Sequence, residues 1–347
     1  PVSRRGRSEH ALLCAKHANG SWTTMRRMRC VRNVRPGFMR RIGVAGITAT
    51  KRRCVSSTAQ LVSHVDVSHV DDGTFEATSA DLGWGRVYGG QTMAQAAAAC
   101  IRHAGPSRTL HQFSCHFLKG GDVTLGMRIE TEELAAGRSF SFVHARALQA
   151  GQPILTMTAT LQTPEPGLDH QSHKGGLLPE WSSPHNCTSL AEHMQPFLQT
   201  KISNQKLRDL YSDQAPIEMR PAVFVSPWDH KPRPPQRAIW MRVKGPLPDD
   251  AAVHQRLLTY ISDWSLLETA IFPHDAALWS PKTRVASLSH TMHFHRPFRA
   301  DEWLCHVMIS PSASGARGFA RGEFYTEAGV LVASTAQEGL MRWNKKG

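Results

Sequence analysis

The chain has 347 residues and a mass of 38.5 kDa, which exceeds the usual size of one domain and predicts two folding units of similar size. Hydrophobic residues make up 41% of it and charged residues 20%, a balance that excludes a disordered chain. The net charge of +13 comes from residues 1–60, which hold 14 Lys and Arg and one acid, Glu9. Because the remainder carries 27 basic and 27 acidic residues, the sequence excludes a basic nucleic-acid groove in the folded body.

Residues 1–60 form a basic leader that we expect to be disordered. Its arginines, scattered among apolar and hydroxyl residues, have the composition of a mitochondrial presequence. The alternative is an extension that is absent from the mature protein, which would then start at Met25, Met28 or Met39. We expect a mitochondrial location if the leader is authentic and a peroxisomal or cytoplasmic one otherwise, although residues 344–347 do not form a Ser-Lys-Leu address.

Two segments after the leader look like diverged copies of one plan. They are residues 61–163 and 236–347, and residues 164–235 between them form a proline-rich linker in which we expect short helices. Residues 136–140 correspond to residues 315–319 in the second copy. Each copy then continues through an Ala-Gly turn into a run of residues rich in β-branched side chains. Both copies therefore predict β-hairpins.

One helix precedes the strands in each copy. Residues 91–103 are rich in alanine, which favours a thin helix that a sheet can wrap closely. The second helix shows an apolar stripe at helical spacing, formed by Leu257, Tyr260, Ile261, Trp264, Leu267 and Ile271. A helix followed by a long antiparallel sheet, present twice, predicts an α+β architecture. This is the double hot-dog arrangement, in which each sheet curls around its helix and the two sheets join edge to edge.

Short motifs are spread over both copies, at residues 86–91, 249–250, 253–255, 260, 262–263, 290, 294–298, 316–319, 322–325, 331–335, 337–339 and 341–342. Together they resemble the acyl-CoA thioesterase II family of bacterial and peroxisomal enzymes. The resemblance covers nearly all of the chain apart from the leader and the linker. It implies hydrolysis of acyl-CoA to a fatty acid and CoA, no cofactor, and at least a homodimer.

The resemblance also implies a catalytic trio. The family holds and activates a water with an Asp, a Thr and a Gln, which match Asp263, Ser287 and Gln337 in this sequence. Ser287 departs from the family pattern, because it keeps the hydroxyl and lacks the methyl group. Ser289 departs from it as well, since the bacterial enzymes carry an acid at that position.

The residue types of the trio suit this chemistry. Asp263 is the only carboxylate and therefore the candidate base, and a helical wheel places it at the edge of the apolar stripe, where partial desolvation raises proton affinity. Strict alternation along residues 285–295 predicts that Ser287 shares a face with Ser289, opposite His290. Ser287 and Gln337 would orient the water by hydrogen bonding, and the alternative is that both are ordinary sheet residues.

Substrate-binding groups are expected at a helix start, where unpaired N–H donors favour negative charge. Gly89, Gly90 and Gln91 open the first helix and permit close approach of a substrate, although the glycines equally suit helix-to-sheet packing. The start of the second helix is the other candidate. Arg317 is a candidate contact for a CoA phosphate, or else an ordinary surface arginine.

Other chemistries find less support in the sequence. No Gly-x-Ser-x-Gly or His-Glu-x-x-His is present, no metal-ligand set is complete, and no apolar run of about 18 residues predicts a transmembrane helix. Seven cysteines without a Cys-x-x-Cys pair favour a reducing compartment. Two alternatives remain on the same fold: a hydratase or dehydratase, which would need an Asp/His pair aimed at the acyl chain, and a non-catalytic acyl-CoA-binding protein.

Overall fold

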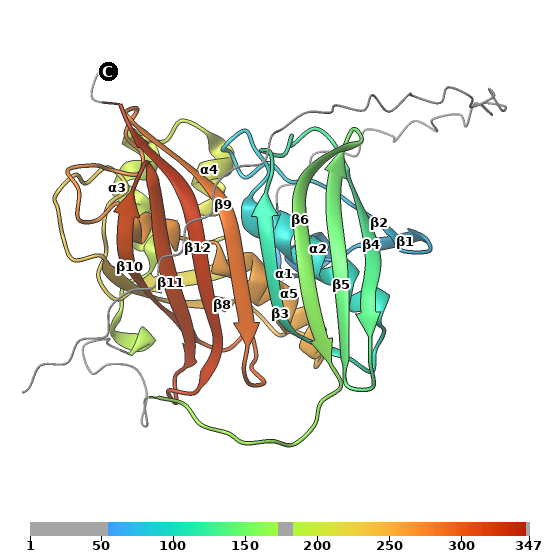
Figure 1. The fold of residues 1–347 in the computed structure, drawn as a ribbon. Coiled ribbons are helices and arrows are strands. Elements are labelled where there is room, and N and C mark those ends of the chain that lie inside the picture. Colours follow the sequence, from blue (N-terminus) through green and yellow to red (C-terminus); the bar gives the residue numbers. More distant parts are fainter. Residues whose placement is uncertain (1–54, 173–182, 345–347) are drawn as a thin grey trace, which may run out of the picture. The chain divides into compact units, whose positions relative to one another are not determined.

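A single sheet organises the protein. The computed structural model describes residues 55–172 and 183–344, which all belong to one compact unit, Ile47–Gly347. The sheet has 12 strands in the order β1-β2-β4-β5-β6-β3-β9-β12-β11-β10-β8-β7 (Figure 1). All neighbouring strands in it are antiparallel.

The sheet consists of two halves that join at β3 and β9. The first half contains β1 (Ser68–Asp71), β2 (Thr74–Ala77), β4 (Met127–Ala136), β5 (Phe140–Gln149), β6 (Gln152–Gln162) and β3 (Thr109–Phe117). The second contains β9 (Thr283–Phe294), β12 (Leu331–Trp343), β11 (Arg317–Thr326), β10 (Leu304–Ser314), β8 (Gln236–Val243) and β7 (Ile217–Pro221). The join runs from Gln112 opposite His293 to His116 opposite Ser289. It removes one exposed edge from each half.

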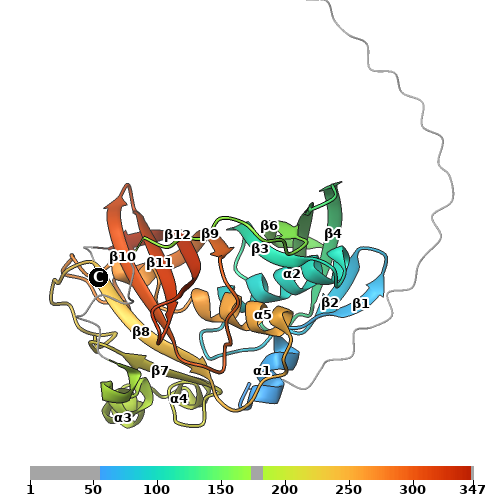
Figure 2. The same ribbon diagram turned by 90° about the horizontal axis from the view of Figure 1, so that it is seen from below.

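Two helices, α2 (Gly89–Ala104) and α5 (Ala251–Ser262), lie against one face of the sheet and against each other (Figures 1 and 2). Ala94 and the alanines at 96–99 of α2 are fully buried, so α2 serves as the thin helix that the sequence predicts. Alternate side chains of β5, such as Val143 and Ala145, are buried on this face, whereas Phe140 and Phe142 are exposed on the other. Because successive side chains of a strand point to opposite faces of the sheet, its apolar side chains gather on the one face that packs against the helices.

The second helix is shorter than its apolar stripe predicts. It ends at Ser262, Asp263 occupies the C-cap, and Ser265 adopts a left-handed conformation with φ of 60°. A short 3-10 helix, Leu267–Ala270, follows. The stripe residues are buried nonetheless, because the turn keeps them on the core side. The expectation that Asp263 lies inside the helix is therefore wrong, since the chain turns at that residue.

The described part of the linker between the halves contains short helices. It forms the 3-10 helix Pro184–Asn186 and the helices α3 (Leu190–Thr200) and α4 (Gln205–Leu210), seen beside β7 in Figure 2. Strand β7 was not predicted from this proline-rich stretch. It pairs with β8 at the edge of the sheet and ends at Pro221, which an edge strand tolerates because its outer N–H groups need no partner strand.

The leader overlaps the first ordered element. Helix α1 runs from Thr58 to His64 and is capped by the Ser57 side chain, which accepts a hydrogen bond from the Gln60 N–H. It therefore begins before residue 60, where the leader was expected to end. Residues 1–54, on which the targeting prediction rests, lie outside the described part of the chain.

Candidate active site

The structure brings Asp263, Ser287 and Gln337 together. The Gln337 side-chain amide donates from Nε2 to Asp263 Oδ1 at 2.6 Å and to Ser287 Oγ at 2.8 Å. The Ser287 hydroxyl is also hydrogen-bonded to the Asp263 carboxylate. Three residues from distant parts of the sequence thus form one hydrogen-bonded group.

The first turn of α2 completes this group. The Gly90 N–H donates to Asp263 Oδ2 at 2.9 Å, so the positive end of the α2 dipole faces the carboxylate. A Cβ atom on Gly90 would lie 2.3 Å from Tyr260 O and 2.5 Å from the Tyr88 ring. Glycine is required here because α2 approaches α5 so closely. The Tyr88 hydroxyl donates to Tyr260 O at 3.0 Å and closes the same junction.

A β-bulge turns Ser287 toward the trio. On β9, Ser289 lies opposite Glu338 and Ser287 lies opposite Gly339, so Leu288 is an extra residue without a partner. The predicted strict alternation is wrong at this point, since the bulge reverses the faces beyond it. Ser287 therefore lies on the same face as His290 and Gln337, toward the helices. Ser289 falls on the opposite face.

Burial raises the pKa of Asp263 above its usual value. Hydrogen bonds from Gln337, the Gly90 N–H and Ser287 oppose this effect, because they stabilise the ionised carboxylate. The side chain is partly buried, and it still holds acceptor positions that these bonds do not use. The site therefore contains a carboxylate with raised proton affinity and room to accept one more hydrogen bond.

A cleft of about 740 Å³ adjoins the trio. All three trio residues line it, together with aromatic and aliphatic side chains such as Trp84, Tyr88, Met194, Phe224 and Trp264. Met194 and Phe224 come from the linker, so this segment covers one side of the cleft. A mainly apolar cleft next to a reactive carboxylate suits a ligand with an apolar portion.

The remaining predicted residues are dispersed. Gly89 lies beside the trio, since a Cβ on it would be 2.6 Å from Asp263 Oδ2. The buried Gln91 side chain points elsewhere, because it donates to Thr78 O at 2.9 Å and accepts from the Ala80 N–H at 3.3 Å. Arg317 lies on the outer face of the sheet, where its Nε is 2.9 Å from Glu338 Oε1, and it does not line the cleft.

The start of the second helix is not near the trio. The Asp250 side chain caps α5 by accepting from the Ala252 N–H, whereas Asp263 follows the last residue of that helix. A helix of 12 residues is about 18 Å long. This distance separates the α5 start from the trio, whereas the start of α2 lies beside it.

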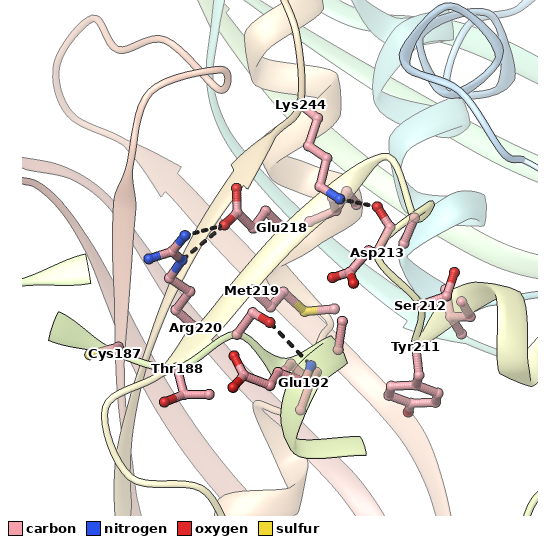
Figure 3. Close-up of a pocket in the computed structure, with 16 residues that line it drawn as sticks. Cys187, Thr188, Glu192, Tyr211, Ser212, Asp213, Glu218, Met219, Arg220 and Lys244 are labelled. Atoms are coloured by element: carbon pink, nitrogen blue, oxygen red, sulfur yellow. Dashed lines mark hydrogen bonds and ion pairs between the residues drawn. The ribbon is translucent and has the colours of Figure 1, made fainter. Parts of the chain in front are cut away.

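A second pocket, of about 310 Å³, lies beside α3 and β7 (Figure 3). Both of its basic side chains are already engaged: Arg220 pairs with Glu218 at 2.7 Å, and Lys244 Nζ donates to Asp213 O at 2.5 Å. No member of the trio lines it. Of these two cavities, the cleft is therefore the one that contains Asp263, Ser287 and Gln337.

Within 55–172 and 183–344, no group of three or more His, Cys, Asp and Glu side chains is placed to hold a metal ion. No helix in these ranges is long and apolar enough to cross a membrane.

The fold and the trio define a double hot-dog enzyme, and comparisons with known proteins specify its family. Residues 206–340 match the family model for acyl-CoA thioesterase, and residues 78–162 match that for the acyl-CoA thioesterase N-terminal domain. Acyl-CoA thioesterase 2 of Haemophilus influenzae is 33% identical over 285 residues, which are 82% of this chain and 98% of that protein. Human acyl-coenzyme A thioesterase 8 is 32% identical over 262 residues, 74% and 81% of the two chains. This chain belongs to the acyl-CoA thioesterase II family.

Solved structures agree with this assignment. Acyl-CoA thioesterase II TesB2 from Mycobacterium marinum is 28% identical with a TM-score of 0.65, and the match covers 82% of this chain and 99% of that one. A hot-dog protein from Alicyclobacillus acidocaldarius shares the fold at 18% identity, with a TM-score of 0.62 over 81% and 97% of the two chains. The predicted α+β double hot-dog fold and the predicted family are confirmed.

Proposed function

We propose that this chain hydrolyses acyl-CoA to a free fatty acid and CoA by direct attack of a water held at Asp263, Ser287 and Gln337. The observation that carries the proposal is the Gln337 amide, which ties a partly buried carboxylate to a hydroxyl at the wall of an apolar cleft. Asp263 is the only acid of the three and acts as the general base.

The reaction follows from these positions. The water oxygen attacks the thioester carbonyl carbon as Asp263 takes one of its protons, and a tetrahedral intermediate forms. The carbonyl oxygen gains negative charge in this step. When the C–S bond breaks, the sulfur leaves with its electron pair and receives the proton from Asp263. The products are the carboxylic acid and CoA thiol, and the enzyme returns to its starting state.

The start of α2 supplies a donor for the oxyanion. The Gly90 N–H is occupied by Asp263, whereas the Gly89 N–H has no hydrogen-bond partner among the described residues. N–H groups in the first turn of a helix lack intrahelical partners, and the helix dipole favours an anion there. Gly89 therefore offers a donor beside the carboxylate at the point where charge develops.

Three arginines at the cleft suit the phosphate groups of CoA. Arg86, Arg284 and Arg342 all line it and are exposed. None of them forms an ion pair with another described residue. Arg284 and Arg342 even lie directly opposite each other on β9 and β12, where like charges repel unless an anion joins them. These residues are better placed than Arg317 to meet a phosphate.

The defining experiment is release of free CoA thiol from saturated acyl-CoAs of increasing chain length by the full chain. We expect turnover with a chain-length preference set by the apolar cleft. Binding of acyl-CoA without turnover would identify a binding protein instead, and hydration of an enoyl-CoA would identify a hydratase. The cleft gives no support to a hydratase, because no histidine among its described lining residues faces Asp263.

Substitutions at Ser287 test the role of its hydroxyl. Ser287→Thr keeps the hydroxyl and should preserve or raise kcat, whereas Ser287→Ala removes a hydrogen-bond partner of both Asp263 and Gln337. We expect Ser287→Ala to lower kcat about tenfold, the scale of one buried hydrogen bond to a charged group. Steady-state kinetics of the three proteins measure this, and equal rates would show that the hydroxyl is dispensable.

The pH profile of the same variants gives a second measurement. Asp263 must be ionised to take a proton, so kcat/KM should fall as the pH drops through its pKa, which burial raises above the usual value. The Ser287 hydrogen bond lowers this pKa. Its loss in Ser287→Ala should therefore shift the acid limb to higher pH, and a shift to lower pH would contradict the assignment.

We also propose that the chain forms a homodimer or a higher homo-oligomer. Leu134, Phe140 and Phe142 on β4 and β5 are 54%, 37% and 42% exposed, and contiguous apolar side chains on a surface favour association. Light scattering of the full chain should give at least twice the monomer mass. Phe142→Ser should lower this mass, with Val223→Ser, at an exposed position of the linker, as the control. A monomeric wild type would exclude the proposal.

A further inference from the structure

A fully buried histidine, His290, lies behind the catalytic trio. It lies on β9 directly opposite Gln337 on β12. Its Nε2 is 3.1 Å from Ser262 Oγ, and its ring stacks on Phe113 with the ring centroids 6.1 Å apart. Ser262 immediately precedes Asp263 at the end of α5. His290 thus lies between the residue before the base and the amide that holds the base.

Two atoms at this contact lack partners that meet hydrogen-bond geometry among the residues that the structure describes. They are His290 Nδ1 and Gln337 Oε1, both buried. Buried polar atoms in folded proteins are nearly always paired, and the two orphan atoms belong to adjacent side chains. Burial lowers the pKa of His290 to about 3, while the neighbouring Gln337 side chain acts to raise it. His290 is therefore neutral at physiological pH and carries one ring proton.

We propose that His290 is a positioning residue that carries its proton on Nδ1 and donates it to Gln337 Oε1, which determines the orientation of the Gln337 amide. An amide has a donor end and an acceptor end. Gln337 needs its donor end at Asp263 Oδ1 and Ser287 Oγ, because a reversed amide would place an oxygen against the carboxylate. A proton on His290 Nδ1 can be accepted only by the amide oxygen of Gln337. It therefore favours the orientation that places Oε1 at His290 and Nε2 at Asp263 and Ser287.

The Ser262 hydroxyl has one proton and two neighbours that can accept it, Thr259 O at 2.8 Å and, when the ring proton is on Nδ1, His290 Nε2 at 3.1 Å. The proposed form of the ring requires that this proton turn from Thr259 O to Nε2, so the contact between Nδ1 and Gln337 Oε1, and not Ser262, selects the form. The opposite form, with the proton on Nε2, would leave a bare Nδ1 facing Gln337 Oε1, lone pair against lone pair. The hydrogen bonds then run from Ser262 through His290 and Gln337 to Asp263, and they hold the amide ready before substrate binds.

Asparagine and glutamine substitutions separate this role from simple packing. The side-chain N–H of His290→Asn can occupy the position of Nδ1, whereas His290→Gln reaches only the position of Nε2. We expect His290→Gln to lower kcat about tenfold or more with KM unchanged, the effect of a lost buried hydrogen bond. His290→Asn should recover most of that loss. Equal losses in the two folded variants would overturn the proposal.

The wild-type protein provides a test that does not depend on activity. In the full chain labelled with ¹⁵N-histidine, nitrogen NMR should show His290 protonated at Nδ1 and bare at Nε2. A proton on Nε2 would overturn the inference, even if both substitutions prevented folding. The inference rests on the proposed hydrolysis only for its kinetic effect: an inactive wild type would refute the hydrolysis, and the ring proton would still decide the role of His290.

Discussion

Asp263→Asn is expected to lower kcat for acyl-CoA hydrolysis by about 10²-fold or more, the scale of losing a general base. The substitution preserves the size of the side chain, and its amide oxygen still accepts one hydrogen bond. It cannot take a proton from water. KM should change little, because Asp263 acts on the water and the apolar cleft holds the substrate. Steady-state kinetics on the pH plateau measure both constants.

Asp301→Asn is a matched control for this variant. Asp301 is also a partly buried carboxylate, bonded to Arg299 at 3.0 Å and to the Leu247 N–H at 3.0 Å, but it does not line the cleft. Its loss should affect the melting temperature more than kcat. Full activity of a folded Asp263→Asn protein would remove this residue from the mechanism and leave the binding and hydratase alternatives.

Sequence patterns predicted the architecture because each half repeats a strong local signal. The alanine-rich run at residues 91–103 predicted a helix that the sheet wraps closely, and α2 is that helix. The matched halves predicted the double hot-dog sheet. Strand β7 was missed because its partner strand, β8, lies beyond a proline-rich stretch of the sequence. No local sequence pattern identifies such an edge strand.

The trio was predicted from the family resemblance, whereas its geometry was not predictable from periodicity. The bulge at Leu288 reverses the faces of β9, so alternation placed Ser287 away from His290. The α5 stripe continued past Asp263, although the chain turns there at Ser265. Both features depend on the tertiary packing of α5 against the sheet. The spacing of apolar residues, with a period of 3.6 residues in a helix or 2 in a strand, carries no information about this packing.

The roles of Gly90 and His290 were missed for a related reason. Gly90 is needed because a Cβ at this position would lie 2.3 Å from Tyr260 O and 2.5 Å from the Tyr88 ring, and this closeness of α2 and α5 is a property of the folded chain. His290 was assigned to the face opposite Ser287. In the sequence, His290 stands out only because it belongs to the motifs that resemble the family. That fact does not show whether its side chain packs in the core or orients a catalytic residue.

Gly89→Ala is expected to lower kcat about 10²-fold while leaving the protein folded. The added Cβ would lie 2.6 Å from Asp263 Oδ2 and 3.1 Å from the Phe117 ring. The carboxylate must move, since the α2 backbone cannot, and a displacement near 1 Å in a catalytic group costs about this factor. Because alanine favours a helix more than glycine does, by up to about 1 kcal/mol, the melting temperature should stay close to that of the wild type.

The combination of lost activity and retained stability distinguishes this effect from general misfolding. Gly126→Ala is the matched control, since its Cβ would meet only Ala77 O at an ordinary 3.7 Å, away from the cleft. It should leave both kcat and stability nearly unchanged. Gly90→Ala, whose Cβ would lie 2.3 Å from Tyr260 O, should instead destabilise the fold, because a backbone atom cannot give way. If Gly89→Ala retained wild-type kcat, the close approach of α2 to the Asp263 carboxylate would have no part in catalysis.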